Sequence, residues 1–520
     1  MATASEVPIL IVGGGAAGTI LSLELARHGV EARTVDKLAS PTITSRAITI
    51  HSRTAELLER VDKRLIDRLQ AQTIQNKGYV LHFVDGAGAR SEVRPGMDFT
   101  AVDSRYPYIL IQRQSETEDL IREFLREEYG RETEWDTRCT DVTQDEDGVT
   151  ATLVHGDRGD EEEHVRCRFL VACDGANSRV REAAGLTREG HGYAGMVLQN
   201  MDAFLNGFPD VDDYVHYCAG TDHFVMVARL PGGFYRLLSS DRGAMAADPD
   251  PKHAFRSILD KHFDGVGLGD VVWHSKWEHK LGLAQTYRKG NVFLAGDSAH
   301  VHPTTGGQGM NCCMQDAFNL GWKLAMVETG RARPALLDSY ERERRPIAEQ
   351  VLWAAESLQD VFMGHGRDIA ERSRQIHDPE WLDAVVGTCS GISYTYRDYV
   401  DAAAGLTPFG GPAIGDRAPD GDLVDGRTIY HLMRHPRFTL LAIQTDDGVD
   451  ISSVSQSIRR RFKPVMKTVV LDAMPDIEDP YGADPRSRFF LVRPDGYIGF
   501  RCLASEAARL EEYLEEQFTL

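Results

Sequence analysis

The N-terminal part of the chain opens on an apolar run that stops at glycines. Residues 9–12 are all apolar, and apolar side chains then recur at helical spacing until Gly29. This pattern predicts a buried parallel strand followed by a helix. Residues 30–35 predict a second strand, which ends at Asp36. Strand, glycine turn, helix and strand together predict a βαβ unit with a right-handed crossover.

The periodicity of the next part of the chain changes from helical to strand-like. Helical spacing recurs over residues 54–69 and 117–128, whereas residues 140–169 alternate as in a hairpin or meander with a turn at Asp147. Residues 195–285 are rich in strand-forming and aromatic side chains. We therefore expect a separate sheet in that region.

The strand and helix pattern of the N-terminal part returns after this region. Residues 292–295 predict a strand, and a helix is expected from Met310 to Thr329. A long charged helix is expected from Ala335, with a kink at Pro346. Together with the first unit, this pattern predicts one α/β domain built from two separate segments of the chain.

The composition changes at Gly410, where glycines and prolines mark a linker or a domain entry. Beyond this point the strands, the helices and a hairpin around residues 494–496 follow in the order βαβββα, which resembles thioredoxin. The redox cysteines of thioredoxin would follow the first of these strands, where residues 445–447 contain no cysteine. We therefore expect this domain to be structural rather than redox-active.

The chain of 520 residues carries 79 acidic and 58 basic residues, which gives a net charge of −21. Such a balance argues against nucleic acid or an anionic membrane surface as a partner. A cationic leader and an apolar run of about 20 residues are both missing, so we expect a cytoplasmic protein. The eight cysteines have neither paired nor zinc-type spacing. This spacing favours reduced thiols and predicts neither disulfides nor a metal site.

Residues 13–18 fit the GxGxxG pattern of a dinucleotide-binding turn. The first glycine allows the tight turn, the second lets the backbone approach a pyrophosphate, and the third lets helix and sheet pack closely. Backbone N–H groups at the helix start could bind the phosphates, and the carboxylate of Asp36 could bind ribose hydroxyls. The pattern by itself leaves FAD and NAD open.

A second cluster, residues 291–311, joins a strand to a glycine-rich helix start. Asp297 could hold a ribityl hydroxyl, and the helix that begins after Gly309 would point its positive end at the bound group. A reduced flavin carries negative charge along its N1–C2 edge, which a helix N-terminus stabilises by about 0.3–1 kcal/mol. This second cluster therefore favours FAD.

The motifs together resemble the class A flavoprotein monooxygenases, the family of p-hydroxybenzoate hydroxylase and phenol hydroxylase. Besides the two glycine clusters, residues 173–181 are similar to the family's Asp-Gly motif, and residues 45–47 to the segment whose arginine approaches the flavin. Gln114 matches a glutamine near the ribityl chain, and residues 340–346 are also typical. The thioredoxin-like tail places the resemblance in the phenol hydroxylase and polyketide hydroxylase branch.

The resemblance implies an α/β fold with a Rossmann-type FAD-binding domain at residues 1–190 and 285–355 and a β-sheet substrate domain at 191–284. A helical connector at 356–409 and a C-terminal thioredoxin-like domain at 410–520, lacking redox cysteines, complete the expected organisation. A second GxGxxG is missing, which fits a family in which the nicotinamide binds transiently over the flavin.

The resemblance also implies which residues form the site. The expected FAD contacts are Gly13, Gly15, Ala16, Ala17, Gly18, Asp36, Lys37, Arg46, Gln114, Asp174, Gly296, Asp297, Pro303, Gly307, Gly309, Met310 and Asn311. The expected catalytic or substrate-facing residues are Arg46, Pro303, Tyr217 and Tyr235, with His223 and Arg236 as further candidates on the same sheet. His300 and His302 could pair on a metal, but a structural role is expected.

Two positions depart from the family pattern. Thr304 stands where a proline is usual, and Ile48 stands where phenol hydroxylase has an acidic residue that acts on the substrate hydroxyl. We therefore expect either a substrate other than simple phenol or another way of deprotonating its hydroxyl.

The implied activity is hydroxylation of a small phenolic or polycyclic aromatic substrate with FAD, O2 and NADPH or NADH, through a flavin C4a-hydroperoxide. A Baeyer–Villiger or epoxidising monooxygenase on the same scaffold and a non-catalytic FAD-binding module remain as alternatives. Dimers are common in the family, so a homodimer is also open. The sequence identifies neither the substrate nor which nicotinamide, NADH or NADPH, is used.

Overall fold

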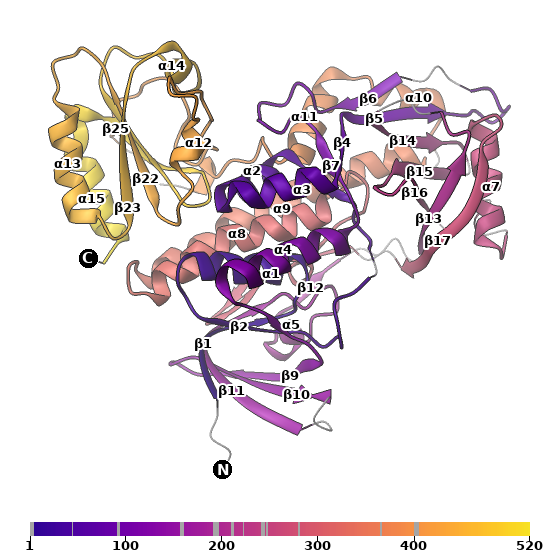
Figure 1. Ribbon diagram of the computed structural model, residues 1–520, viewed down its shortest axis with the longest axis horizontal. Helices are drawn as coiled ribbons and strands as arrows, with labels where there is room; N and C mark the ends of the chain where they lie inside the picture. Colours follow the sequence, from indigo (N-terminus) through magenta and orange to yellow (C-terminus); the bar gives the residue numbers. More distant parts are fainter. Residues whose placement is uncertain are drawn as a thin grey trace.

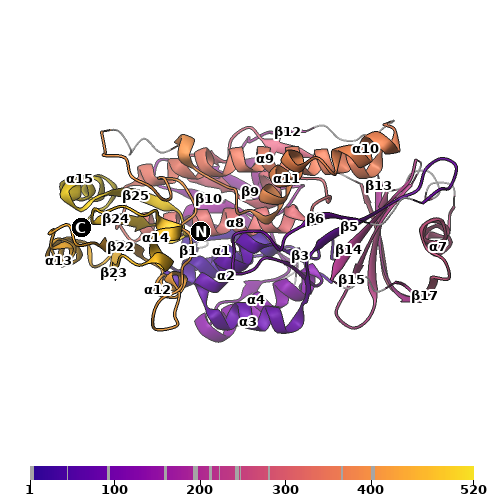
Figure 2. The ribbon, with the colours of Figure 1, turned by 90° about the horizontal axis from the view of Figure 1, so that it is seen from above.

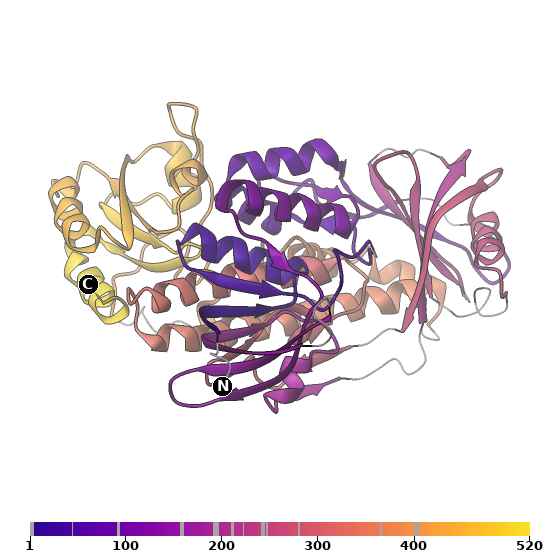
Figure 3. The ribbon, with the colours of Figure 1, turned by 60° about the horizontal axis from the view of Figure 1, so that its bottom comes forward.

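The computed structural model describes residues 5–43, 45–90, 94–156, 161–190, 197–209, 213–221, 223–240, 245, 248–278, 281–364, 367–399 and 405–519. The molecule is elongated, with a mixed α/β unit in the middle (Figures 1 and 2). A sheet with a covering helix lies at one end and the C-terminal unit at the other, and Figure 3 shows the same arrangement from another side. Among the described helices, none is long and apolar enough to cross a membrane.

The middle unit is built on a mixed sheet with the strand order β19-β20-β11-β1-β2-β8, which β10 and β9 extend from β11. Strands β1, β2, β11 and β20 pair in parallel, and the predicted meander forms the antiparallel part. The strands are β1 Ser5–Val12, β2 Ala32–Val35, β8 Thr133–Glu134, β9 Thr137–Gln144, β10 Val149–His155, β11 Glu161–Ala172, β19 Arg288–Lys289 and β20 Val292–Leu294. The predicted βαβ unit and the return of the chain near residue 292 are therefore both present.

The helices of the middle unit and of the connector form layers beside this sheet. Their bounds are α1 Ala16–Arg27, α2 Ser52–Val61, α3 Lys63–Gln72, α4 Gln114–Tyr129, α5 Arg179–Ala183, α8 Gln308–Glu328, α9 Asp338–Met363, α10 Ile369–Gln375 and α11 Pro379–Ser390. Helix α1 packs against α8, which places the two glycine-rich helix starts in one layer.

The helical pattern predicted over residues 54–69 is confirmed, but it is divided between two separate helices, α2 and α3. Asp62 between them is extended, and its side chain caps α3 by accepting a hydrogen bond from the N–H of Arg64. Such a local cap competes with continued helix, since it satisfies a backbone donor at the new start. By contrast, α9 continues through Pro346.

Short strands and turns connect these layers. They are β3 Thr49–Ile50, β4 Ile74–Asn76 and β7 Ile109–Ile111 in one small sheet, and β12 Arg188–Glu189, β18 Gly282–Ala284 and β21 His300–Val301 in another. The 3-10 turns are η2 Gly296–Ser298, η3 Pro334–Leu337 and η4 Arg397–Tyr399.

The second large sheet has the strand order β17-β13-β16-β15-β14-β5-β6. Its strands are β5 Gly78–Phe83, β6 Arg94–Asp98, β13 Val197–Asn206, β14 Tyr214–Ala219, β15 Phe224–Arg229, β16 Tyr235–Ser240 and β17 Gly267–Glu278, and helix α7 Pro251–His262 packs on one face. The predicted sheet at 195–285 is therefore present.

The sequence boundary of this sheet needs a correction. Strands β5 and β6 belong to it, although residues 1–190 were all expected in the dinucleotide-binding domain. The reason is the parallel pairing of β5 with β14, a contact between distant parts of the chain that local patterning does not reveal. The expected boundary after residue 190 falls on residues 191–196, which lie outside the described residues.

The C-terminal unit has the strand order β23-β22-β24-β25, with β22 and β23 parallel. Its elements are α12 Ile429–Leu432, β22 Phe438–Gln444, α13 Ile451–Phe462, β23 Met466–Asp472, α14 Pro475–Tyr481, β24 Arg488–Val492, β25 Ile498–Leu503, η6 Ala504–Glu506 and α15 Ala507–Gln517. The predicted order βαβββα is confirmed, with α14 as an addition.

Buried charges join the C-terminal unit to the middle unit. Arg493 donates two hydrogen bonds of 2.7 Å to the carboxylate of Glu343 in α9, and Arg53 in α2 donates to the carbonyl of Asp495 at 2.7 Å. Breaking such a buried pair costs about 3–5 kcal/mol because one charge is left without its partner. The unit is therefore firmly docked on α2 and α9.

Candidate active site

The glycines of the first cluster serve two different purposes, close backbone packing and open space for a ligand. A Cβ atom at Gly13 (φ +111°) would lie 2.2 Å from the carbonyl oxygen of Cys173, and one at Gly18 would lie 1.8 Å from that of Gly13. The fold itself therefore requires these two glycines. At Gly15 a Cβ atom would meet, among the described residues, only Glu118 Oε1 at 3.9 Å. The space in front of Gly15 and the first turn of α1, formed by Ala16 and Ala17, is thus open to a pyrophosphate.

The carboxylate of Asp36 is held at the C-terminal end of β2. Its Oδ2 accepts a hydrogen bond from the N–H of Gly14 at 2.8 Å, and its Oδ1 accepts one from Leu38 at 2.9 Å. These bonds fix the carboxylate beside the glycine turn, in the place where the motif expects a ribose contact. Lys37, the neighbouring candidate, is exposed.

The start of α4 holds the segment that carries Arg46. The side chain of Gln114 accepts a hydrogen bond from the N–H of Ala47 at 3.3 Å and donates one to Glu118 at 2.8 Å. Burial raises the pKa of Glu118, whose Oε1 lies 3.9 Å from the Cβ position at Gly15. Arg46 itself is exposed, with its guanidinium 5.7 Å from the ring centroid of Trp277. The arginine therefore lies where β17 of the second sheet approaches the middle unit.

The second glycine cluster forms the N-terminus of α8. Gly307 (φ +69°) is the N-cap, and a Cβ atom at Gly309 would meet no described atom within 4 Å. The side chain of Asn311 ties this turn to β3, since it donates to the carbonyl of Thr49 at 3.0 Å and accepts from the N–H of His51 at 2.9 Å. Open space thus lies at the positive end of this helix as well.

Two further carboxylates of the predicted site lie near these helix starts. Asp297 follows Gly296 in η2, and its Oδ1 accepts a weak hydrogen bond from the thiol of Cys313 at 3.4 Å. Asp174 accepts hydrogen bonds through Oδ2 from the N–H groups of Arg179 and Val180. Its Oδ1 is buried and has no hydrogen-bond partner among the described residues. An orphaned acceptor of this kind suits a hydroxyl donor on a bound cofactor.

The remaining predicted FAD contacts lie in the same two loops. Pro303 and Met310 are buried on either side of the Gly306 turn. Thr304, the departure from the family pattern, accepts a hydrogen bond from the N–H of Gly307 at 3.2 Å. Open space in front of Gly15 and Gly309 and the orphaned oxygen of Asp174 together fit a dinucleotide that spans both helix starts.

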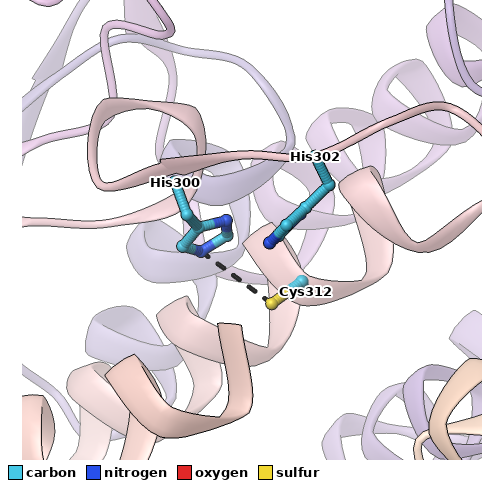
Figure 4. A group of neighbouring side chains, drawn as sticks. All are labelled: His300, His302 and Cys312. Carbon is cyan, nitrogen blue, oxygen red and sulfur yellow. Dashed lines mark hydrogen bonds between the residues drawn. The ribbon is translucent and has the colours of Figure 1, made fainter. Parts of the chain in front are cut away.

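His300, His302 and Cys312 offer ligand atoms that lie within 4.8 Å of one another, and Figure 4 shows them turned toward a common point. His300 Nε2, however, lies 2.5 Å from Asp316 Oδ2, and Arg344 Nη2 lies 3.6 Å from the sulfur of Cys312. The guanidinium already supplies the cation of this cluster. The geometry therefore favours the structural role expected for the two histidines.

The charges of this cluster shift the pKa values of its members. Burial lowers the pKa of His300, but the neighbouring Cys312 and Asp316 outweigh it and raise the value to about 10. Burial raises the pKa of Asp316, but His300 and Arg344 outweigh it and lower the value to about 2. A buried ion pair of His300 and Asp316 follows.

The second sheet turns the predicted aromatic residues to different faces. Tyr217 lies on the face toward the middle unit and packs on Phe362 of α9, with ring centroids 4.4 Å apart. Tyr235 lies on the opposite face with α7 and packs on Phe208 at 5.2 Å. His223 also lies toward α7, with Nε2 at 2.8 Å from that of His262. The structure therefore does not bring Tyr235 and His223 together with Arg46 and Tyr217.

A buried charge cluster that sequence reasoning missed lies beside Arg46. Asp202 in β13 accepts hydrogen bonds from Arg236 in β16 and from Arg113 at 3.1 Å. Arg236 also donates to the carbonyl of Ser45 at 3.0 Å. Arg236 was a sequence candidate, whereas Asp202 and Arg113 were not. The available signal was an acidic residue between the apolar residues Met201 and Ala203, in a strand whose residues 198–203 are all buried.

Comparisons with known proteins agree with this geometry. Residues 6–355 match the family model described as FAD binding domain, and residues 411–519 match the model described as aromatic-ring hydroxylase, C-terminal. Pentachlorophenol 4-monooxygenase of Sphingobium chlorophenolicum is 36% identical over 96% of this chain and 94% of its own length. The 12-dehydrotetracycline 5-monooxygenase/anhydrotetracycline 6-monooxygenase of Streptomyces rimosus is 31% identical over 94% of both chains.

Solved structures show the same architecture over the whole chain. The anhydrotetracycline hydroxylase OxyS from Streptomyces rimosus has a TM-score of 0.76 and 29% identity, covering 99% of both chains. The flavin-dependent monooxygenase PieE in complex with FAD and substrate has a TM-score of 0.80 over 98% of this chain and 99% of its own, at 22% identity, which is a likeness of fold alone. The expected family is therefore confirmed: the chain belongs to the FAD-dependent aromatic monooxygenases, in the branch that carries the aromatic-ring hydroxylase C-terminal domain.

Proposed function

We propose that the protein uses NAD(P)H and O2 to hydroxylate a phenolic or polycyclic aromatic compound. The observation that supports this most directly is the open space kept in front of Gly15 and Gly309, at the N-termini of α1 and α8. The relatives support the substrate class, since their names refer to pentachlorophenol and anhydrotetracycline.

We propose that FAD lies across the two helix starts. The first turn of α1 would bind the pyrophosphate, Asp36 a ribose, and Asp297 the ribityl chain. The N-terminus of α8 would stabilise negative charge on the pyrimidine edge. When bound there, FAD would supply the redox chemistry by which NAD(P)H, a proton and O2 yield NAD(P)+, water and one hydroxyl group on the ring.

The substrate would lie between the flavin and the face of the second sheet that carries Tyr217. Ile48 is 6% exposed and belongs to the apolar cluster on this face, so the position that is acidic in phenol hydroxylase supplies a hydrophobic wall here. We propose that cationic charge from Arg46 stabilises the phenolate instead, because a nearby cation lowers the pKa of a phenol. Tyr235 has no part in this proposal.

The test is NAD(P)H oxidation by the purified yellow protein across a panel of phenols, chlorophenols and polycyclic phenols. We expect at least one aromatic to accelerate the oxidation of NADH or NADPH well above the rate without substrate. A protein that binds FAD but whose NAD(P)H oxidation responds to none of these aromatics would contradict the proposal. It would favour a non-catalytic FAD-binding module.

A further inference from the structure

The turn at Gly306 and Gly307 lies where three parts of the fold meet. A Cβ atom at Gly306 (φ +84°) would lie 2.9 Å from Leu358 of α9 and 3.1 Å from the sulfur of Cys389 in α11. On the other side, the carbonyl of Gly307 accepts a hydrogen bond from Thr49 Oγ1 at 2.9 Å. The turn that caps α8 is therefore in contact with the connector helices and with β3.

One tyrosine of the second sheet reaches the same turn, and a second tyrosine packs against its ring. The hydroxyl of Tyr79 in β5 donates to the carbonyl of Gly306 at 3.5 Å, a long hydrogen bond. Tyr217 of β14 is buried beside Tyr79. The two rings pack edge to face with centroids 5.0 Å apart. The Tyr79 hydroxyl thus joins this sheet to the turn, and Tyr217 packs against the Tyr79 ring.

His51 reaches the turn from the middle unit. Its ring is buried against Phe99, with centroids 5.4 Å apart, and a Cβ atom at Gly307 would lie 3.2 Å from its Nε2. Burial lowers the pKa of His51 to about 3. A neutral imidazole is therefore packed against the turn on the side of the middle unit.

These contacts differ in how firmly they fix the turn. The bonds of Thr49 and Asn311 to the Gly307 carbonyl, at 2.9 and 3.0 Å, belong to the same unit as α8 and have ordinary lengths. The bond of Tyr79 spans from the second sheet and is long, so a small shift of the sheet would strengthen or break it. Of these contacts, the tyrosine bond is the one best placed to respond to a ligand on the sheet.

We propose that Tyr79 is a positioning residue that, with Tyr217, couples the second sheet to the Gly306 turn. An aromatic compound bound against the sheet then sets the position of the α8 N-terminus, and with it the pyrimidine edge of FAD. The inference rests on the proposed function, because it needs FAD at α8 and an aromatic on the sheet.

The test compares Tyr79→Phe with the wild type and with Tyr481→Phe. Tyr481 is a matched control, since its buried hydroxyl also donates to a backbone carbonyl, that of Pro419 at 2.8 Å in the C-terminal unit. Three quantities are measured: the FAD dissociation constant of the apoprotein, the change of the flavin absorbance spectrum on adding an aromatic without NAD(P)H, and H2O2 released per NAD(P)H oxidised.

We expect Tyr79→Phe to bind FAD within about twofold of the wild type, since no expected FAD contact is removed. The aromatic-induced spectral change should fall about fivefold or more, which is the lower end of typical coupling between sites. H2O2 release should rise, and Tyr481→Phe should match the wild type in all three measurements.

A Tyr79→Phe variant with the wild-type spectral change and the wild-type H2O2 yield overturns the inference and leaves the proposed function intact. A wild type whose NAD(P)H oxidation responds to none of the aromatics overturns the proposed function and the inference with it. A wild type that oxidises NAD(P)H with an aromatic but whose flavin spectrum does not respond overturns the inference alone. If Tyr79→Phe does not fold, amide hydrogen exchange of residues 304–309 in the wild-type holoenzyme decides. Slower exchange with the aromatic supports the coupling, and unchanged exchange contradicts it.

Discussion

Asp316 of α8 accepts a hydrogen bond from the backbone N–H of Gly296 at 3.1 Å, and so joins the helix to the turn that carries Asp297. The same carboxylate accepts a hydrogen bond from Arg344 Nε at 2.8 Å and another from His300 Nε2. The buried cations of Arg344 and His300 therefore fix the Asp316 carboxylate, and this carboxylate in turn orients the backbone at Gly296, directly before Asp297. This charge cluster therefore fixes the turn that carries the proposed ribityl contact.

Substitution of Gly15 and Gly18 by alanine should separate cofactor binding from folding. A Cβ atom at Gly15 enters open space, so Gly15→Ala should fold with a nearly unchanged melting temperature but bind FAD at least about tenfold more weakly. A Cβ atom at Gly18 would lie 1.8 Å from the carbonyl oxygen of Gly13, so Gly18→Ala should lose melting temperature even without FAD. Thermal unfolding of both apoproteins and FAD titration are the measurements. Equal loss of stability in the two variants would contradict the open cradle at Gly15.

Asp297→Ala should yield protein with little bound FAD. A charge-assisted hydrogen bond contributes about 1.5–3 kcal/mol, so we expect the FAD dissociation constant to rise about 10- to 150-fold. Flavin absorbance per protein after desalting measures the occupancy, and Asp67→Ala, at an exposed position of α3, is the control. Full occupancy in Asp297→Ala would remove this residue from the cofactor site.

His300 should make the fold less stable as the pH rises. Its pKa is about 10 in the folded state and near 6.5 when unfolded, so the folded state holds an extra proton between these values. The stabilisation is complete below pH 6.5 and is lost progressively toward pH 10. Between pH 6.5 and 8.5 this loss amounts to about 2 kcal/mol. His300→Gln keeps a donor for Asp316 but does not titrate, so its melting temperature should vary less over this range. An equal decline in both proteins would show that His300 is neutral.

His262 should destabilise the second sheet at low pH. Burial first, and the neighbouring His223 second, lower its pKa to about 3, against about 6.5 in the unfolded chain. The unfolded state therefore binds more protons below pH 6.5, and stability is lost as the pH falls toward 3. Thermal unfolding at pH 7 and 5 should show a smaller decline for His262→Gln than for the wild type. His253→Gln, at an exposed position on the same helix, is the control. If the melting temperature of His253→Gln declines as little as that of His262→Gln, the pH effect is not due to His262.

The elements that the sequence predicts well are those set by neighbours along the chain. The βαβ unit around residues 9–36 and the turn near Asp147 depend on local glycines and on short apolar runs, and both are present. For the same reason, the sequence predicts that Gly13, Gly15 and Gly18 lie at the turn between the first strand and the first helix. The C-terminal order βαβββα is likewise a local pattern.

The elements that the sequence does not predict depend on contacts between distant segments. The Asp202 cluster joins residues 89 and 34 positions apart, so no window of the chain contains it. The face of the sheet on which Tyr217 or Tyr235 lies depends on which face packs against α7. The sequence does not show this, because both aromatic residues are equally typical of a strand. The sheet partner of β5 lies more than a hundred residues away along the chain, which explains the boundary error at residues 78–98.

The most direct test of aromatic hydroxylation is the product formed under ¹⁸O2 with the best substrate of the phenol panel. The account predicts one ¹⁸O atom per product molecule, attached to a carbon of the aromatic ring, with NAD(P)H consumed in equal amount. Oxygen inserted beside a carbonyl or into an epoxide, or a product whose new oxygen comes from water, would contradict it.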